Sequence, residues 1–345
     1  MPDNDIPEIT PVRELHRIDE QALMNYLSER IDDDFSSWTL RQFEGGQSNP
    51  TYLLETGSNQ YVVRKKPPGE LLKSAHQVDR EFKVMDALQG SAVPVPKTYF
   101  LCEDESVLGQ AFYVMGHVEG RVVTDPTLPN LPEADRKPLY DDFIRVLAEL
   151  HKVNREEVGL GNFGRAGNYY ERQISRWTKQ FKYSETEVIP EMDALIEWFP
   201  ENIPQSDETT LVHGDYRMGN AIVHPTEPRI VAILDWELCT TGHPLGDLAY
   251  NCMMYYTAER EVVKATPGLP TEQELLDMYC RHAKRAPIKY CSFYMIYNIY
   301  RSAAIVQGVY KRGLNGNASS DTWQERKDSC RQQAEIAWQL VELNR

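Results

Sequence analysis

The hydrophobic pattern of this chain changes its period once, near residue 116, and this change constrains the fold most strongly. Before it, alternating apolar residues predict short strands at 38–43, 51–55, 61–64, 98–102 and 111–115, with helical spacing at 19–31 and 74–88. After it, two short strands are expected between residues 211 and 236. The remaining segments with helical spacing are 132–153, 168–181, 189–198, 245–257, 271–284, 288–311 and 321–343. The sequence therefore predicts an α+β fold with two lobes, a small antiparallel sheet with one helix and a larger helical part.

This pattern divides the chain into three expected segments. Residues 1–18 are expected to form a loose leader, residues 19–116 the sheet-rich N-terminal lobe, and residues 117–345 the helical C-terminal lobe. The most apolar long stretch, 290–310, contains Asn298 and Arg301 in its middle. Because a charged side chain is costly inside a bilayer, we expect this stretch to be a buried core helix rather than a membrane span. Arg301 must then be paired or line a cavity.

Charge and cysteine usage narrow the class of protein. The net charge of −15 argues against binding of bulk nucleic acid, which usually requires a basic face. It would favour a cationic substrate, although a solvated acidic surface explains it equally simply. The six cysteines form no CxxC pair, so reduced thiols in a cytoplasmic protein are expected. The acidic, proline-containing start predicts no signal peptide, and we expect neither a membrane partner nor more than a monomer or homodimer.

The segment Leu-Val-His-Gly-Asp-Tyr-Arg-Met-Gly-Asn at 211–220, with Asp-Trp-Glu at 235–237 after an apolar run, carries the strongest chemical signal. Phosphoryl transfer requires a carboxylate at the acceptor hydroxyl, hard oxygen ligands for Mg²⁺, and a cation near the transferred group. Asp215 is the candidate base, Asn220 and Asp235 are the candidate metal ligands, and Arg217 is the candidate cation near the γ-phosphate. A salt-bridged structural loop, with Asp235 as a cap, is the alternative interpretation.

These motifs resemble a known family. His213-Gly214-Asp215 with Asn220 resembles the catalytic loop of protein kinases, and Gly214 together with Asp235-Trp236-Glu237 resembles aminoglycoside phosphotransferases and choline kinases. The closest resemblance is to the kinase-like domain fused to some acyl-CoA dehydrogenases, carried by residues 64–69, 158–164 and 170–173. It covers roughly residues 35–340. The resemblance implies a kinase that uses ATP and Mg²⁺ to phosphorylate a hydroxyl of a small molecule.

The resemblance also assigns supporting roles at the catalytic loop. His213 is expected to order this loop rather than to act as the base, because Asp215 already has that role. Asp247 matches a position that supports the loop, although a helix cap is an equally good interpretation. His243 receives no role beyond a turn.

On the nucleotide side, the resemblance implies a strand cation that holds the phosphates and pairs with a helix glutamate. Arg64 takes that strand position, and Glu81 is the expected partner; Lys65 should face the other way, because side chains alternate along a strand. The loop residues expected to cover the phosphates are Gly45, Gly46, Gln47, Ser48 and Asn49. Backbone groups near Val114 and Met115 are expected to meet the adenine edge, which leaves the choice between ATP and GTP open.

Two further nucleotide motifs can be dismissed. The GxGxxG match at 159–164 follows a predicted helix rather than a strand, so it lacks the context of a dinucleotide-binding turn. No GxxxxGK[ST] motif of a P-loop protein occurs in the chain.

The acceptor pocket should be built from helices of the C-terminal lobe, although aromatic residues at helical spacing are commonly core. The candidates are Tyr170, Trp177, Tyr255, Tyr256, Tyr294, Tyr297 and Arg301. An aminoglycoside-like acceptor predicts an acidic pocket, whereas a hydroxyacyl-CoA or similar anion predicts Arg and Lys at its mouth. The sequence does not decide between these acceptors.

Two other functions compete with a small-molecule kinase. A nucleotide-binding pseudokinase would act as a regulatory or interaction protein, but the presence of Asp215, Asn220 and Asp235 counts against it. A protein kinase would need a peptide-docking segment, and only eleven residues separate Asp235 from Gly246.

Overall fold

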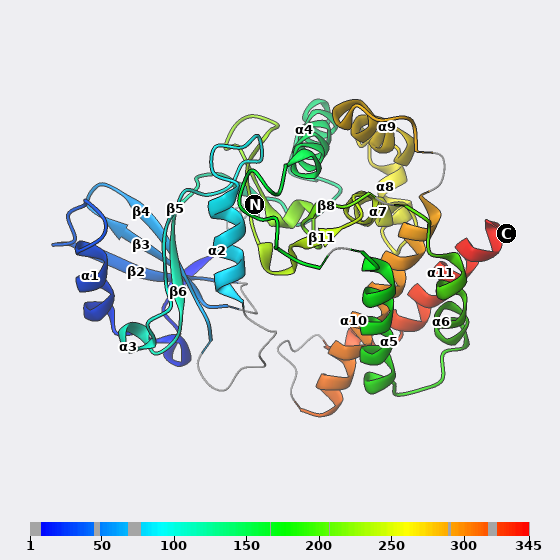
Figure 1. The fold of residues 1–345 in the computed structure, drawn as a ribbon, viewed down its shortest axis with the longest axis horizontal. Helices are drawn as coiled ribbons and strands as arrows, with labels where there is room; N and C mark the ends of the chain where they lie inside the picture. Colours follow the sequence, from blue (N-terminus) through cyan, green and yellow to red (C-terminus); the bar gives the residue numbers. More distant parts are fainter. Residues whose placement is uncertain are drawn as a thin grey trace. The chain divides into compact units, whose positions relative to one another are not determined.

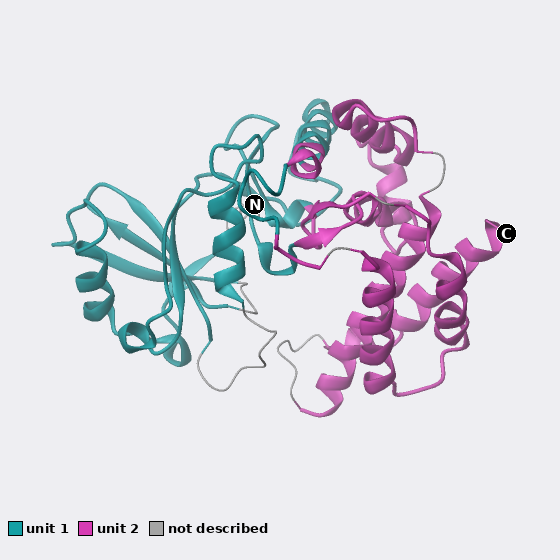
Figure 2. Ribbon diagram, viewed as in Figure 1, with its two compact units in different colours: residues 1–146, 154–161, 218–239 teal, residues 147–153, 162–217, 240–345 magenta. Residues whose placement is uncertain are grey.

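The chain is divided between two compact units. The structure, a computed structural model, describes residues 8–44, 49–67, 77–165, 167–206, 208–288, 291–316 and 323–344. Unit 1 comprises residues 1–146, 154–161 and 218–239, and unit 2 comprises residues 147–153, 162–217 and 240–345 (Figure 2). The chain passes from unit 2 to unit 1 between Arg217 and Met218, within the segment that carries the chemical signal. The lobe boundary expected at residue 116 remains a prediction.

Unit 1 contains most of the strands (Figure 1). Its strands are β1 (Ile9–Pro11), β2 (Trp38–Phe43), β3 (Thr51–Thr56), β4 (Gln60–Lys65), β5 (Thr98–Cys102), β6 (Phe112–Gly116), β7 (Arg121–Val122), β9 (Ala221–Val223) and β10 (Ile230–Ile233). Its helices are η1 (Glu14–His16), α1 (Glu20–Ser28), α2 (Val78–Ala87), α3 (Glu105–Leu108), η2 (Met218–Asn220), η3 (Trp236–Leu238) and the first part of α4 (Glu133–Lys152).

The six-stranded sheet of unit 1 is antiparallel throughout, in the order β1-β2-β3-β4-β6-β5. Side chains alternate along β4. Tyr61 and Val63 join a core with α1 and α3, whereas Arg64 contacts Glu81 of α2. Because of this alternation, Arg64 is the cation of β4 that contacts α2. Lys65, the next residue, points to the opposite face of the sheet, as expected.

One strand lies within the expected leader. Residues Ile9–Pro11 form β1, which pairs with β2 through Ile9 opposite Phe43. Three residues are too few to show a strand period, so the sequence pattern did not indicate this strand. Part of the leader is therefore an edge strand of the sheet.

A second sheet in unit 1, in the order β10-β9-β7, positions the residues that flank the β9–β10 hairpin. The Leu234 N–H donates to the Asn220 carbonyl at 2.8 Å, just beyond the paired residues. Asn220 and Asp235 therefore lie at the same end of this hairpin. Together with β8 (Thr210–Val212) of unit 2, three strands occur between residues 210 and 236, so the expectation of two was wrong. Strands this short carry too little alternation to be counted from sequence.

Unit 2 is helical around α10 (Figure 1). It also contains the last residues of α4, and β8 pairs with β11 (Thr240–Gly242). Its other elements are α5 (Tyr169–Ser184), α6 (Pro190–Asn202), α7 (Leu245–Cys252), η4 (Met253–Tyr255), α8 (Arg260–Ala265), α9 (Glu272–Ala283), α10 (Ser292–Leu314), η5 (Trp323–Arg326) and α11 (Ser329–Leu343). The helix α10 packs against α5, α7 and α11. Within the described ranges, no helix has both the length and the apolar character that a membrane crossing requires.

Candidate active site

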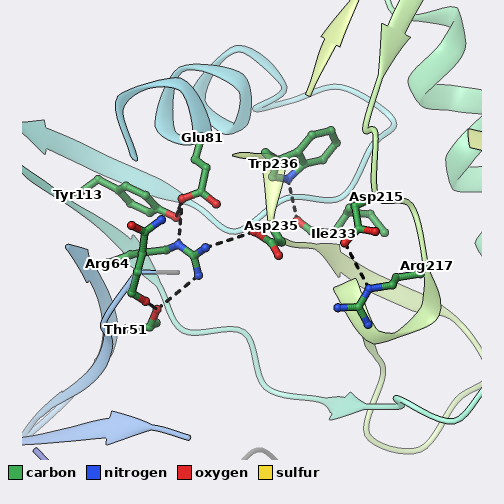
Figure 3. A network of polar contacts seen from close by, with 10 residues as sticks. Thr51, Arg64, Glu81, Tyr113, Asp215, Arg217, Ile233, Asp235 and Trp236 are labelled. Atoms are coloured by element: carbon green, nitrogen blue, oxygen red, sulfur yellow. Dashed lines mark hydrogen bonds and ion pairs between the residues drawn. The ribbon is translucent and has the colours of Figure 1, made fainter. Parts of the chain in front are cut away.

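A cluster around Arg64 brings together three distant segments of unit 1 (Figure 3). The guanidinium donates from Nε to Glu81 Oε2 at 2.9 Å and from Nη2 to Asp235 Oδ1 at 3.2 Å. Its third nitrogen, Nη1, lies 3.4 Å from the hydroxyl of Thr51 on β3. Because the five N–H groups of arginine form a fixed planar fork, one side chain can hold α2 and the end of β10 at once.

Burial makes the Arg64–Glu81 pair strong and costly to break. The side chain of Glu81 is 1% exposed, that of Arg64 15%, and that of Asp235 33%. Burial raises the pKa of Glu81 to about 7, against the opposing effect of the Arg64 charge. Burial alone would lower the pKa of Arg64, but Glu81, Tyr113 and Asp235 hold it above its ordinary value. Arg64 therefore remains charged at every pH at which the protein is folded.

Asp235 has an unusual backbone conformation directly after β10. Its φ of 64° and ψ of 58° lie in the left-handed region, which residues other than glycine rarely adopt. The Trp236 indole donates to the Ile233 carbonyl at 3.0 Å and secures this turn (Figure 3). Such conformations concentrate at functional sites, where the surrounding structure maintains them. Here the turn directs the Asp235 carboxylate toward Arg64.

The residues at the end of the β9–β10 hairpin fit a magnesium site that is completed by a nucleotide. A carboxylate at Asp235 and an amide at Asn220 supply the hard oxygen atoms that Mg²⁺ prefers. Within the described residues, no group of three or more His, Cys, Asp or Glu side chains could hold a metal. Because Mg²⁺ commonly takes one or two protein ligands and fills its remaining positions with water and phosphate oxygens, this pair is sufficient only with a bound phosphate.

In unit 2, the carboxylate of Asp247 holds the backbone of the candidate catalytic loop. Its Oδ2 accepts the His213 N–H at 2.7 Å, and its Oδ1 accepts the Gly214 N–H at 2.9 Å. Burial opposes ionisation of Asp247, but His151 and the His213 N–H hold its pKa below the ordinary value. In the part of the chain that the structure describes, no side chain caps the N-terminus of α7. Of the two interpretations of Asp247, the structure therefore favours the one in which it holds the loop over the one in which it caps the helix.

Other side chains fix the rest of this loop. Arg301 Nη1 donates to the Gly214 carbonyl at 2.7 Å, and the Asn251 amide donates to the Tyr216 carbonyl at 2.8 Å. The ring of His213 accepts the Asp215 N–H at Nδ1, at 3.2 Å, which is a contact expected of a residue that orders the loop. Gly214 has a φ of 83°, which side-chain-bearing residues rarely adopt. This conformation explains glycine at this position.

The carboxylate of Asp215 contacts two neighbours in unit 2. Arg217 Nε donates to Asp215 Oδ2 at 3.3 Å (Figure 3). Tyr250 of α7 also bonds to Asp215, and burial together with this carboxylate raises the pKa of the phenol. Both contacts leave Asp215 about one-fifth exposed, as a base that must reach a substrate requires.

A small pocket, partly open to solvent, lies beside this loop within unit 2; its free volume is about 10 Å³, roughly the room that one water molecule needs. Three of the seven expected acceptor residues border this pocket: Tyr170, Tyr297 and Arg301. Trp177 lies behind it, with its ring 5.5 Å from the Arg301 guanidinium, and Tyr294 stacks on His243, which borders the pocket.

Besides Trp177 and Tyr294, two further expected acceptor residues, Tyr255 and Tyr256, do not border this pocket. The hydroxyl of Tyr255 donates to the Pro270 carbonyl, and that of Tyr256 donates to Glu272. Their role in an acceptor pocket stays a prediction, because helical spacing alone does not say which neighbour a face meets.

Comparison with known proteins identifies the family. The model of the phosphotransferase enzyme family matches residues 39–282. The chain belongs to this family. The mouse acyl-CoA dehydrogenase family member 10 is 42% identical over an alignment of 347 positions, which covers 97% of this chain and 32% of the mouse protein. Human acyl-CoA dehydrogenase family member 11 is 40% identical over an alignment of 331 positions, which covers 92% of this chain and 42% of that protein. The phosphotransferase chain thus spans about a third to two fifths of these curated relatives.

Solved structures show that the phosphotransferase has the expected α+β, two-lobe kinase-like fold. A Ralstonia eutropha protein provisionally named an aminoglycoside phosphotransferase is 43% identical, with a TM-score of 0.86 over 95% of this chain and 99% of its own. A streptomycin–ATP ternary complex of the phosphotransferase APH(2")-IIa has a TM-score of 0.58 at 17% identity, over 84% of this chain and 90% of its own. The second likeness concerns the fold alone.

The predicted site residues of the phosphotransferase fall into both units. Arg64, Glu81 and Asp235 meet in unit 1, with Asn220 at the end of the same hairpin as Asp235. Asp215, Arg217 and His213 meet in unit 2. Of the expected phosphate loop, residues 45–48 (Gly45, Gly46, Gln47 and Ser48) lie outside the described residues, and Asn49 is buried.

The expected adenine contacts near Val114 and Met115 stay a prediction, which the pairing of β6 qualifies. Val114 and Met115 lie in β6, where β4 and β5 pair with them from both sides. Because a central strand directs its backbone groups toward its neighbours, those of Val114 and Met115 are already used. The chain leaves the sheet after Gly116, where the Gly116 and His117 N–H groups donate to the Lys97 and Gln60 carbonyls, so the segment at Val118 and Glu119 is the first beyond these bonds.

Sequence reasoning missed several residues of the site. Thr51, Tyr113 and Asn251 carry no motif, and their roles depend on neighbours that are distant in the chain. Tyr250 lies on the same helix as Asp247, so its helical spacing from Asp247 was a usable signal. The sequence shows that Arg301 is an unusual charge in an apolar helix, but it does not indicate that the Gly214 carbonyl is its partner.

Proposed function

We propose that this chain transfers the γ-phosphoryl group of Mg²⁺-bound ATP to a hydroxyl of a small molecule. The observation that carries the proposal is the Arg64 guanidinium, which joins Glu81, 17 residues away, and Asp235, 171 residues away, in one cluster. A permanently charged fork between a helix glutamate and a candidate metal ligand suits a nucleotide with bound Mg²⁺. The family match and the ATP complex of a protein with this fold support the same proposal.

Each residue then has a stated role. Arg64 binds the α- and β-phosphates, and Asp235 and Asn220 hold Mg²⁺, which would neutralise charge on the phosphate oxygens. Asp215 accepts the proton of the acceptor hydroxyl as its oxygen bonds to the γ-phosphorus. The bond from that phosphorus to the bridging oxygen breaks, and ADP leaves. Arg217 stabilises the charge of the transferred group, and backbone groups of the segment that follows β6 meet the adenine edge.

For the acceptor, we infer a hydroxyl compound that also carries an anionic group, such as a hydroxyacyl-CoA. Arg301 borders the pocket beside the catalytic loop; within the described residues it forms no ion pair at contact distance, and Asp215 is the carboxylate whose charge helps to raise its pKa. Its contacts are the Gly214 carbonyl and the rings of Trp177 and Tyr250. The carboxylate that borders the pocket, Asp247, is already bonded to the loop. Among the described residues that border the pocket, a polyamine would find no carboxylate apart from the bonded Asp247, so we give the local charge more weight than the net charge of the whole chain.

The test combines binding with turnover. Purified protein with Mg-ATP is assayed for ADP formation against hydroxyacyl-CoAs, free hydroxy acids, matched neutral alcohols and aminoglycosides. We expect turnover with the anionic alcohols. Asp215→Asn should reduce kcat by about 100-fold or more with ATP affinity preserved, because its proton contact is made in the transition state. Asp235→Asn should weaken Mg²⁺-dependent nucleotide binding as well.

Controls separate this proposal from the alternatives. Asp277→Asn, at an exposed position of α9, is the matched control and should leave both quantities unchanged. Equal ATP consumption by Asp215→Asn and the wild type would instead favour the pseudokinase. Unchanged metal dependence in Asp235→Asn would refute the ligand assignment. The cytoplasmic location and the monomeric or homodimeric state remain predictions.

A further inference from the structure

A buried histidine lies behind the carboxylate that holds the catalytic loop. His151, in the last turn of α4, and Asp247 have side chains that are 4% and 6% exposed. His151 Nε2 lies 3.5 Å from Asp247 Oδ2, the oxygen that accepts the His213 N–H. On the other side of the ring, His151 Nδ1 lies 2.7 Å from the hydroxyl of Tyr279 on α9. All these residues belong to unit 2.

The chemistry of the neighbours fixes the direction of each contact. Among the described residues, His151 Nε2 makes no hydrogen bond of normal geometry, and its contact with Asp247 is an electrostatic one at ion-pair distance. Because the carboxylate can only accept, a proton on Nε2 is the arrangement that attracts it. In the neutral ring, Nδ1 is then an acceptor, and the Tyr279 hydroxyl donates to it. The Tyr279 oxygen in turn bonds to Arg285, which forms an ion pair with Glu208 at 2.9 Å. A row of donors therefore runs from the surface of unit 2 to Asp247, and each member points toward the carboxylate.

We propose that His151 is a positioning residue for the phosphoryl-transfer reaction: by holding Asp247 Oδ2, it fixes the loop backbone that places Asp215. This rests on the proposed function. The Asp247 carboxylate makes two short bonds to the loop, and without His151 it could turn toward one of them at the expense of the other. A loop shifted by about 1 Å can lower turnover on the order of 100-fold, although no substrate contact is lost.

Two amide substitutions separate the roles of the ring nitrogens. In His151→Gln, the amide reaches the former place of Nε2 and can donate to Asp247. In His151→Asn, the shorter amide occupies the place of Nδ1 and reaches only Tyr279. We expect His151→Asn to lower kcat by about 100-fold and His151→Gln by less than about 5-fold, with the KM for ATP unchanged in both. Equal losses in the two variants, or a rise in KM without a change in kcat, would overturn the proposal.

Hydrogen exchange tests the same inference without any acceptor. In His151→Asn, the amides of His213 and Gly214 should exchange at least about 10-fold faster than in the wild type, because the carboxylate that protects them is loosened. Tyr279→Phe should show the same change to a smaller degree. Tyr300→Phe is the matched control, since it removes another buried phenol hydroxyl of unit 2, which bonds to Thr178 at 2.8 Å.

The outcomes distinguish the two proposals. Unchanged exchange at His213 and Gly214 in His151→Asn would refute the positioning role, whatever the enzyme phosphorylates. Faster exchange in Tyr300→Phe, equal to that in Tyr279→Phe, would also refute it, because the effect would then reflect general loosening of unit 2. Faster exchange confined to the His151 and Tyr279 variants, in a protein that phosphorylates no alcohol, would retain the positioning of the loop and refute the kinase.

Discussion

Replacing Arg64 by methionine tests the Arg64 cluster most directly. Methionine fills similar volume but leaves Glu81, which is 1% exposed, without its cation. Above the pKa of Glu81, removing one partner of a buried ion pair costs about 3–5 kcal/mol, because the remaining carboxyl must either stay charged and desolvated or bind a proton. For a unit of this size, that corresponds to a fall in melting temperature of roughly 10 °C. Asp235 adds little to this cost, since it is one-third exposed and water can replace Arg64.

The stability that Arg64→Met loses relative to the wild type should increase as the pH rises. An unfolded glutamate titrates near pH 4.3, and burial raises the pKa of Glu81 in the folded protein to about 7. A carboxyl with a raised pKa stabilises the fold below the unfolded value, and this contribution is lost as the pH rises through the folded value. Without Arg64 the folded pKa rises further. The stability difference from the wild type should therefore widen above pH 7, by about 1.4 kcal/mol per pH unit, until the new pKa is reached.

Thermal unfolding between pH 5.5 and pH 8.5 measures this effect, with Lys66→Met as the matched control. Lys66 follows Arg64 by two residues and pairs with Asp79 at 3.5 Å, but both side chains are exposed to solvent, so its loss should cost less than about 1 kcal/mol. Adding Glu81→Leu to Arg64→Met should recover most of the lost stability, because no buried charge then remains. The reasoning fails if Arg64→Met unfolds at the same temperature as Lys66→Met at pH 8, or if the double variant is no more stable than Arg64→Met.

Two further predictions concern stability alone. Burial lowers the pKa of His243 from 6.5 to about 4, so the neutral ring stabilises unit 2 above pH 6.5 and this contribution, up to about 3 kcal/mol, is lost as the pH falls toward 4. Denaturant titrations at several pH values should show that the free energy of unfolding of the wild type falls with decreasing pH, and that it falls less steeply in His243→Gln. Equal slopes in the two proteins would exclude His243 as the source of the pH dependence. Gly120→Ala would place a Cβ 2.3 Å from Ile222 and 2.4 Å from the Val223 carbonyl, so we expect a loss of about 1–3 kcal/mol, measured by thermal unfolding. A melting temperature equal to that of the wild type would show that β9 can move aside.

Local patterns predicted much of the fold. The strands β2 and β5 begin and end at the residues expected from alternation, and α4 and α9 match their expected ranges within a residue. Some short elements, such as β1, β7 and α8, were missed, because the few residues in each show no clear hydrophobic pattern. The Arg64–Glu81 pair was predictable, since Arg64 alternates with Lys65 on a strand and Glu81 lies in the first turn of the next helix.

The amino-acid sequence by itself determined the types of chemical group in the site and their order along the chain: the loop of Asp215, the hairpin that ends at Asp235, and the strand cation Arg64. Tertiary structure alone decided that Arg64 contacts Asp235, that Asp247 and Arg301 hold the loop at Gly214, and that His151 lies behind Asp247. The physical reason is range. Alternation and helical spacing act over a few residues, whereas these contacts join residues up to 171 positions apart, and only packing of the whole unit brings such residues together.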